Sequence, residues 1–227
     1  MSDTAVSEVR RGARRPWDAQ LARRLVTPLA DTRITPNHLT AVRLAVGLAG
    51  AAAFIPGTYL WSNVAALLLI LSNFLDHADG ELARISGKSS RAGHWFDLAS
   101  DAIVTITLFV AMGVGVPDAA APALGVPPQL VGTVAGAAVA LIFFLRMRIE
   151  EMAGKGASRQ ASFGGFETED VLYLLPLVTL CSGEWTFLLA ASIGAPLFAV
   201  WVVIDFRRVA RRLKPVTARP PSGAGLA

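Results

Sequence analysis

TYLWSNVAALLLILSNFLDHADGELAR, residues 58–84, decides the fold, because an apolar stretch runs without a break into a cluster of charged residues. The apolar part, 58–75, is long enough to cross a bilayer, which takes about 20 mostly apolar residues in a helix. Similar blocks occur elsewhere in the chain: Leu39–Ile55, Trp95–Val116, Gln129–Leu145, Trp185–Ile204 and the shorter Val171–Cys181. Together they predict an all-α integral membrane protein.

The composition agrees with this interpretation. Of the 227 residues, 53% are hydrophobic and 17% are charged, whereas soluble domains carry about 25% charged residues. The one cysteine, Cys181, excludes a fold that is held by disulfides within the chain. Residues 1–37 are polar and basic, and no segment fits a secretory signal.

The distribution of basic residues predicts the number of spans. All but one of the 21 Lys and Arg residues lie in alternate polar segments, starting with the N-terminal one. Because Lys- and Arg-rich loops stay in the cytoplasm, both termini are expected there, and the number of spans must be even. We therefore expect six transmembrane helices in a bacterial-type inner or plasma membrane. The predicted parts are a cytoplasmic N-terminal segment (1–37), a six-span domain (38–206) and a basic, disordered cytoplasmic tail (207–227).

The N-terminal segment is expected to hold a juxtamembrane amphipathic helix over residues 15–29. Its apolar residues recur at helical spacing: Trp17, Leu21, Leu25 and Leu29. Arg23 and Arg24 lie beside them. The net charge of +4 is compatible with nucleic acid as a partner, but arginines that flank apolar helices attract anionic lipid headgroups. We expect membrane lipids and no nucleic acid as partners.

Four aspartates lie where the second and third spans meet the cytoplasm. Asp76 and Asp79 are three residues apart and share one helix face, and Asp97 and Asp101 share a face of the next helix. The linker 85–92 is short, so the two helices are expected to be antiparallel neighbours. Four carboxylates can then converge on one small volume.

Such a cluster needs positive charge. Each Asp at mid-bilayer costs about 2.5–3.5 kcal/mol, and like charges repel. Arg84 alone is too little, whereas one or two divalent cations suffice, and oxygen ligands favour Mg²⁺ or Mn²⁺ over zinc. These ions commonly bridge carboxylates to a substrate phosphate, which Arg84 is also suited to bind. Arg43, inside the first span, either extends to the membrane interface or reaches the cluster.

The motif resembles the signature of the CDP-alcohol phosphotransferase family. Its pattern is D-x-x-D-G-x-x-A-R-x(8)-G-x-x-x-D-x-x-x-D, formed by Asp76, Asp79, Gly80, Ala83, Arg84, Gly93, Asp97 and Asp101. Thr35-Pro36-Asn37 is similar to the family's entry to its first span. Glu81 and His77 occupy variable positions of the motif, where contacts on the helix surface are expected.

The resemblance implies a Mg²⁺- or Mn²⁺-dependent enzyme of phospholipid biosynthesis. A substituted phosphate group would pass from a CDP-linked donor, expected to be CDP-diacylglycerol, to a small polar alcohol or lipid acceptor, with release of CMP. By the family pattern, Asp76, Asp79 and Asp97 would bind a first metal, Asp79, Asp97 and Asp101 would surround a second, and Asp101 would be the general base. The residues implied to contact the donor or give it room are Asn37, Gly80, Ala83, Arg84, Ser90 and Gly93. A homodimer is a family expectation.

Residues 146–170 and the function itself leave alternatives open. The basic residues of this loop suit an acceptor phosphate, and its acidic run 167–170 suits an amine or a polyol, or else caps the fifth span. Asn73, Asp76 and Asp79 also resemble an aspartate motif of prenyl-diphosphate-using membrane transferases, which usually carry a second such motif. A non-enzymatic divalent-cation transporter is the other alternative, although transporters usually show inverted repeats or broken helices at the midplane.

Overall fold

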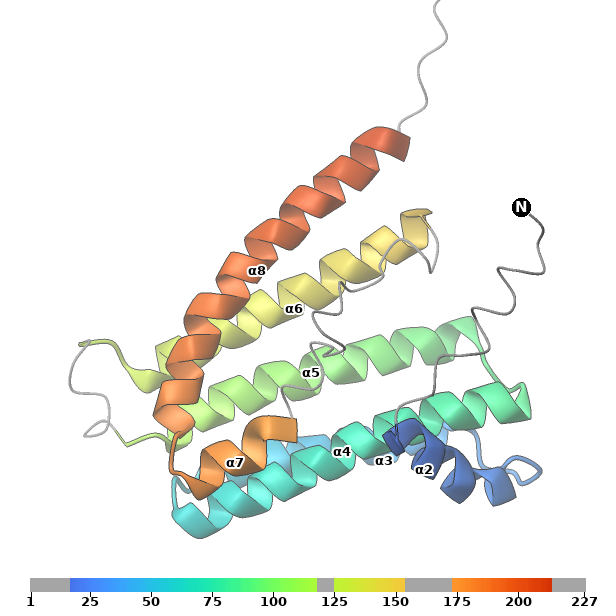
Figure 1. Ribbon diagram of the computed structural model, residues 1–227, viewed down its shortest axis with the longest axis horizontal. Helices are drawn as coiled ribbons and strands as arrows, with labels where there is room; N and C mark the ends of the chain where they lie inside the picture. The colour runs from blue at the N-terminus through green and yellow to red at the C-terminus, as the bar shows by residue number, and fades with distance from the viewer. Residues whose placement is uncertain (1–16, 118–124, 154–172, 214–227) are drawn as a thin grey trace, which may run out of the picture.

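The computed structural model describes residues 17–117, 125–153 and 173–213, and all regular structure within them is helical (Figure 1). The elements are α2 (Trp17–Val26), the 3₁₀ helix η1 (Thr27–Leu29), α3 (Pro36–Ala53), α4 (Tyr59–Ser86), α5 (Arg91–Gly115), α6 (Pro128–Ala153), α7 (Leu175–Leu180) and α8 (Glu184–Leu213). The all-α fold class is therefore confirmed.

Four helices, α4, α5, α6 and α8, are long and apolar enough to cross a membrane. Helix α3 has 18 residues, about 27 Å at 1.5 Å per residue, but its polar first turn and Arg43 lower its hydropathy. Helix α7 has only six residues, and residues 171–172 of the predicted fifth span lie outside the described part of the chain. The described residues thus confirm four of the six predicted spans as candidates.

Two helices run further than the apolar blocks predicted. Helix α6 continues beyond Leu145 to Ala153, and α8 continues to Leu213, seven residues past the predicted domain boundary at 206. The tail predicted as disordered from residue 207 therefore begins as helix. The reason is that Arg is a good helix former and that Arg211 and Arg212 in the last turn interact favourably with the helix dipole.

Helix α3 is packed tightly into the bundle and contacts both α4 and α5. A Cβ atom added to Gly47 of α3 would lie 2.6 Å from Cγ2 of Val104 and 2.8 Å from Oγ of Ser72. A side chain at this position would push the three helices apart. The same glycine fixes how closely Arg43, one turn earlier on α3, approaches the other two helices.

The apolar core lies along α3, α4 and α5, and continues into α6, α7 and α8. Its buried side chains include Phe54, Leu69, Leu108 and Leu188. Many other large apolar side chains are exposed on the outside of the bundle, for example those of Leu60, Leu67 and Leu197. Exposed apolar surface of this extent is expected where a helix faces lipid rather than water.

Helix α2 lies beside one end of α4 (Figure 1). Its fully buried residues are Ala22 and Val26, which pack against Ala78 and Leu82 of α4. Leu21 and Leu25, predicted to form the apolar face, are 43% and 58% exposed. A helix is therefore present where one was predicted. It packs on the bundle through Ala22 and Val26 rather than through Leu21 and Leu25, because the small Ala22 allows close approach to Ala78.

Candidate functional site

The two helices that carry the aspartates are joined by a short, well-capped turn. Helix α4 ends at Gly87, whose φ of 65° is the left-handed conformation common at helix C-termini. Helix α5 begins after Ser90, whose Oγ accepts a hydrogen bond from the backbone N–H of Gly93 at 3.0 Å. The predicted reversal of direction is confirmed (Figure 1).

The backbones of the two helices nevertheless lie apart along most of their length. Within the described residues, α4 and α5 make almost no direct backbone contact, whereas α3 packs against both. The helices are antiparallel as expected, but their backbones do not pack against each other, because the turn joins them at one end only and α3 packs against both. The aspartates therefore face a gap that α3 closes from one side.

Three of the four predicted metal ligands meet in this gap. Asp76 from α4, and Asp97 and Asp101 from α5, each offer a carboxylate oxygen, and these oxygens lie within 4.8 Å of one another. Their side chains are partly buried, at 25%, 34% and 34% exposure respectively. We refer to these residues as the aspartate trio.

Asp79, the fourth predicted ligand, has a different environment. It is 5% exposed, and its Oδ2 accepts a hydrogen bond from Oγ1 of Thr40 in α3 at 2.8 Å. It still interacts electrostatically with Asp97 and Asp101. Asp79 thus lies close to the aspartate trio without being one of its members.

Arg43 of α3 reaches the aspartate trio, so this one of its two predicted locations is correct. Its Nη1 contacts Oδ1 of Asp76 and lies 3.0 Å from Oδ1 of Asp101. Its Nη2 lies 3.1 Å from Oδ1 of Asp97 and donates a hydrogen bond to the backbone oxygen of Asp97 at 2.9 Å. The side chain is only 3% exposed, as expected for a charge that finds its partners inside a membrane helix bundle.

Thr40 and Arg43 are the site residues that the motif does not contain. They are three residues apart and share the face of α3 that is turned toward the aspartates. A charged residue within an apolar span was a usable signal for Arg43, because such a charge needs a partner. Thr40 gave no such signal, since a hydroxyl in a helix can bond to its own backbone.

The open strip next to the trio is formed by Gly80, Ala83 and Arg84 of α4. A Cβ atom on Gly80 would meet nothing within 4 Å, and the Arg84 side chain is 69% exposed. These features agree with the prediction that a ligand can approach the backbone here.

Glu81 differs from its predicted place on the helix surface. It is 1% exposed, its Oε1 accepts a hydrogen bond from Nη1 of Arg84 at 2.5 Å, and its Oε2 lies 3.6 Å from Nη1 of Arg23 in α2. Because it faces α2 across a packed interface, it is a buried ionic contact between helices and orients Arg84 on its exposed side.

The remaining predicted donor-site residues lie together at the start of α5. A Cβ atom on Gly93 would lie 2.6 Å from Oδ1 of Asn37. Gly93 therefore makes room for the side chain of Asn37, and Ser90 is the N-cap residue of the same helix. The structure brings Asn37, Ser90 and Gly93 into one corner, where their local roles are packing and capping.

Residues 146–153, the first part of the predicted acceptor loop, are the last turns of α6. The guanidinium carbon of Arg146 lies 5.4 Å from the ring centre of Phe198 in α8, in cation–π geometry. Arg148 donates a hydrogen bond to Glu151 at 2.7 Å. Residues 154–170, including the acidic run, lie outside the described part of the chain.

The donor set of the aspartate trio fits a hard divalent cation. All three ligand atoms are carboxylate oxygens, which Mg²⁺ and Mn²⁺ prefer. Oδ1 of Asp97 is buried and makes no hydrogen bond of acceptable geometry, although Arg43 lies nearby. Such an unsatisfied buried acceptor is a natural ligand atom for a metal ion.

Comparison with protein families matches residues 33–205 to the family described as CDP-alcohol phosphatidyltransferase. An archaetidylinositol phosphate synthase of Pyrococcus horikoshii is 32% identical over 102 residues, which are 44% of this chain and 52% of that protein. A bifunctional IPC transferase and DIPP synthase of Rubrobacter xylanophilus is 30% identical over 165 residues, 72% of this chain and 35% of that protein. The chain thus spans about half the length of the first relative and about a third of the second.

Two solved structures share the fold. A Mycobacterium tuberculosis phosphatidylinositol phosphate synthase with CDP-DAG bound has a TM-score of 0.55 and 21% sequence identity, and the match covers 92% of this chain and 98% of that one. The same synthase in complex with manganese and citrate has a TM-score of 0.56 and 20% identity, and covers 91% and 93%. At these identities the likeness concerns the fold.

Proposed function

The chain belongs to the CDP-alcohol phosphatidyltransferase family, and on that premise we propose that it transfers a substituted phosphate group from a CDP-linked donor to an acceptor hydroxyl and releases CMP. The observation that carries the proposal is the aspartate trio, in which two helices that hardly touch place three carboxylate oxygens within 4.8 Å of one another. Four carboxylates at the end of a membrane bundle are costly unless cations offset their charge, and such clusters therefore mark functional sites.

The proposed metal ligands are Asp76, Asp97 and Asp101, with Asp79 beside them, and they would hold one or two Mg²⁺ or Mn²⁺ ions. When bound, the divalent cation neutralises the pyrophosphate and stabilises the leaving phosphate oxygen. Asp101 is the proposed general base, which accepts the proton of the acceptor hydroxyl in the transition state. The manganese complex of the solved relative supports this choice of metal.

The proposed donor is CDP-diacylglycerol, which the solved relative holds. Arg84 would bind its phosphates through the guanidinium fork, oriented by Glu81. Gly80 and Ala83 would let the nucleotide approach α4, because neither carries a side chain long enough to block it. Asn37, Ser90 and Gly93 would border the same nucleotide at the start of α5.

The proposed acceptor is a polyol phosphate. The names of the archaeal relative and the solved relative both contain an inositol phosphate product, which supports this class. Arg146 and Arg148 at the end of α6 are the described basic residues of the predicted acceptor loop, and a guanidinium is suited to a phosphate.

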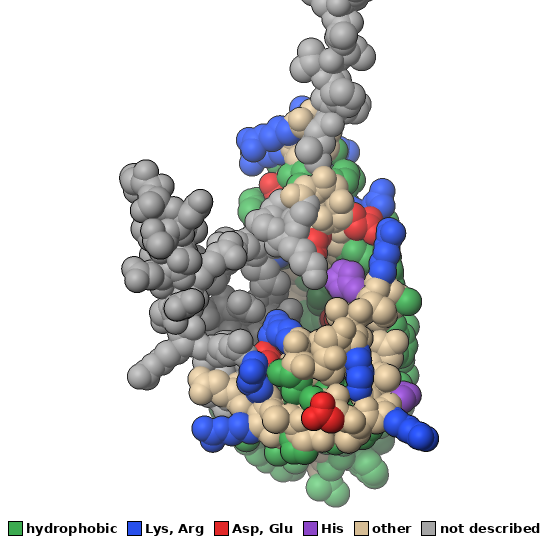
Figure 2. All heavy atoms as spheres, turned by 90° about the vertical axis from the view of Figure 1, so that its right-hand side faces the viewer, with side chains coloured by type: hydrophobic (Ala, Val, Ile, Leu, Met, Phe, Trp, Pro, Cys, Tyr) green, Lys and Arg blue, Asp and Glu red, His purple; other side chains and the backbone are tan. Residues whose placement is uncertain are grey.

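We also propose six spans, with α3 as the first and the segment ending in α7 as the fifth, and α2 lying on the membrane surface. The site and both termini would be cytoplasmic. The end of the molecule that carries the site is rich in Lys and Arg side chains, which supports this orientation (Figure 2). A homodimer, expected from the resemblance, belongs to the same proposal.

The test is a CMP-release assay on the purified full chain with CDP-diacylglycerol, Mn²⁺ and a panel of acceptors: inositol phosphate, glycerol phosphate, inositol and serine. We expect release with one acceptor, and a loss of at least about 100-fold in Asp101→Asn, which removes the base. Asp31→Asn is the control, because Asp31 is an exposed carboxylate before α3. Metal uptake into vesicles without CMP release would favour the transporter.

A further inference from the structure

Arg43 is the residue through which the two halves of the site are joined. The backbones of α4 and α5 hardly approach each other, and Arg43 of α3 contacts Asp76 on one and Asp97 and Asp101 on the other. We propose that Arg43 is a built-in counter-cation of the site: it holds the aspartate trio together in the metal-free protein and leaves the trio when a divalent metal binds. This inference rests on the metal-dependent function proposed above.

The first argument is that the guanidinium and a metal ion compete for one position. The trio offers three ligand oxygens within 4.8 Å of one another, and Oδ1 of each of its aspartates is contacted by a terminal nitrogen of Arg43, two of them by Nη1 and one by Nη2. An ion bound by all three would lie about 2.1 Å from each oxygen. The guanidinium already fills the space between them, so the two cations exclude each other there.

The second argument is electrostatic. Three carboxylates this close repel one another strongly in a partly buried site, and a buried guanidinium without carboxylate partners is equally unfavourable. Within the described residues, no other Lys or Arg contacts the trio. Arg43 therefore offsets part of the trio's negative charge until a cation with two charges replaces it.

The third argument is that the helix that carries Arg43 is held in place by contacts that do not involve the guanidinium. Oγ of Ser72 in α4 donates a hydrogen bond to the backbone oxygen of Arg43 at 3.0 Å, and Gly47 locks α3 against its neighbours. A small cavity of about 30 Å³ beside the guanidinium is lined by Asp76 and Asp101 of the trio together with apolar side chains of α4 and α5, so it offers room for a water molecule or an ion at the trio and not for the guanidinium. Release of the trio therefore needs only the Arg43 side chain to move, because α3 itself stays in place.

The test is a Mn²⁺ titration of the full chain without donor, followed by electron paramagnetic resonance. If Arg43 competes with the metal, Arg43→Met should bind Mn²⁺ at least about tenfold more tightly than the wild type, because the competing state is removed. Its metal-free form should melt at a lower temperature, and Mn²⁺ should restore the melting temperature. Arg33→Met is the control, because Arg33 is exposed just before α3 and should leave the affinity unchanged.

Equal or weaker Mn²⁺ binding by folded Arg43→Met would overturn the inference while leaving the proposed function intact. Absence of Mn²⁺ binding in both proteins would overturn both. If Arg43→Met does not fold, a wild-type structure with Mn²⁺ decides: the guanidinium should have left the trio, and a guanidinium still 3.0 Å from Oδ1 of Asp101 beside a bound ion would refute the competition.

Discussion

Single residues of α3 determine the state of the carboxylates on the helices beside it. The hydroxyl of Thr40 is the described hydrogen-bond donor to the carboxylate of Asp79, which is almost completely buried. A buried acceptor that loses its donor keeps the full cost of its desolvation. The contribution of Thr40 should therefore be large for a single hydroxyl group.

Thr40→Val removes this donor and keeps the shape of the side chain. We expect it to lower the free energy of unfolding by about 1–3 kcal/mol, because Oδ2 of Asp79 is left unpaired. Thr40→Ser keeps the hydroxyl and should lose much less. Thermal unfolding in detergent measures both variants, and equal stability of Thr40→Val and the wild type would contradict the account.

The open space at Gly80 gives a second residue-scale prediction. Neither Gly80 in α4 nor Gly194 in α8 has any atom within 4 Å of an added Cβ. Gly80→Leu and Gly194→Leu should both fold, and each should gain up to about 1 kcal/mol of helix propensity. Only Gly80→Leu should raise the KM for the CDP-linked donor or abolish CMP release, because only that side chain would occupy the donor strip. An unchanged KM and rate of CMP release in Gly80→Leu would show that the open strip does not bind the donor.

At the scale of elements, α2 is fastened to α4 by one apolar and one ionic contact. The apolar contact is formed by Ala22 and Val26, and the ionic contact joins Arg23 to the buried Glu81. Because Glu81 also pairs with Arg84, the position of α2 is coupled to the orientation of a proposed donor-binding side chain.

Ala22→Phe tests this docking. Ala22 is completely buried against α4, so the larger side chain should overpack the contact at a cost of about 1–3 kcal/mol and release α2. Hydrogen exchange should then rise across 17–26 while the core of α4 stays protected. Leu21→Ala is the matched control, since Leu21 is 43% exposed. Unchanged exchange in Ala22→Phe would show that α2 is held elsewhere.

The sequence predicted which side chains share the face of one helix better than it predicted how the helices pack against one another. Spacing within one helix determines which side chains share a face, and it paired Asp97 with Asp101, which the structure also brings together. The separation of α4 from α5 was not predictable in this way, because it depends on the close approach of α3 through Gly47. For the same reason Arg43 was left with two possible positions, and the partner of Asp79 was missed.

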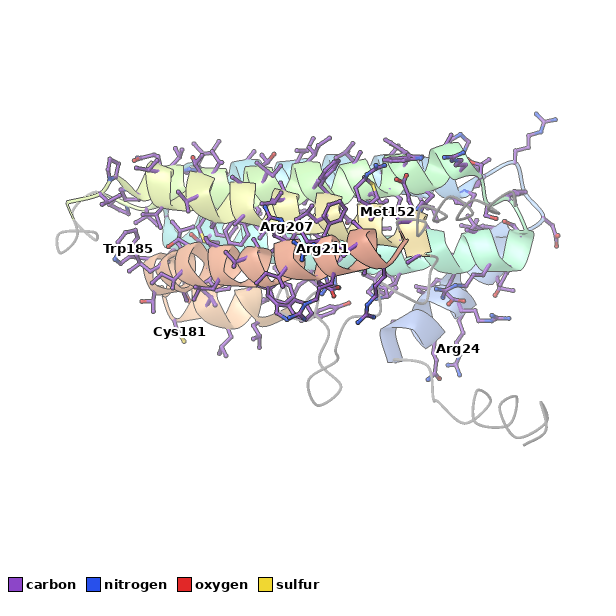
Figure 3. The ribbon with its side chains drawn as sticks, turned by 90° about the horizontal axis from the view of Figure 1, so that it is seen from above. Arg24, Met152, Cys181, Trp185, Arg207 and Arg211 are labelled. Carbon is purple, nitrogen blue, oxygen red and sulfur yellow. The ribbon has the colours of Figure 1, made fainter. Side chains whose placement is uncertain are left out.

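The whole molecule has two chemically different ends. Cys181 and Trp185 lie at one end, and Arg24 lies at the other, where the aspartate site is (Figure 3). The basic side chains around the site end predict a cytoplasmic orientation, and so the turn that holds Cys181 should be on the opposite side of the membrane.

This orientation can be measured with the protein's one cysteine. Cys181 is exposed, so an impermeant maleimide should label it in intact bacterial spheroplasts. Ser89→Cys in a Cys181→Ser background should be labelled only after the membrane is opened, because Ser89 is exposed in the turn between α4 and α5. The reverse pattern would invert the proposed topology.

The most direct test of the central claim, that α4 and α5 jointly hold the metal on which transfer depends, is CMP release with one ligand removed from each helix. Asp76→Asn and Asp97→Asn should each lose at least about 100-fold, and chelation of divalent metal should stop the wild type, with recovery on adding Mn²⁺. Undiminished CMP release in either variant, or in the presence of chelator, would contradict the account.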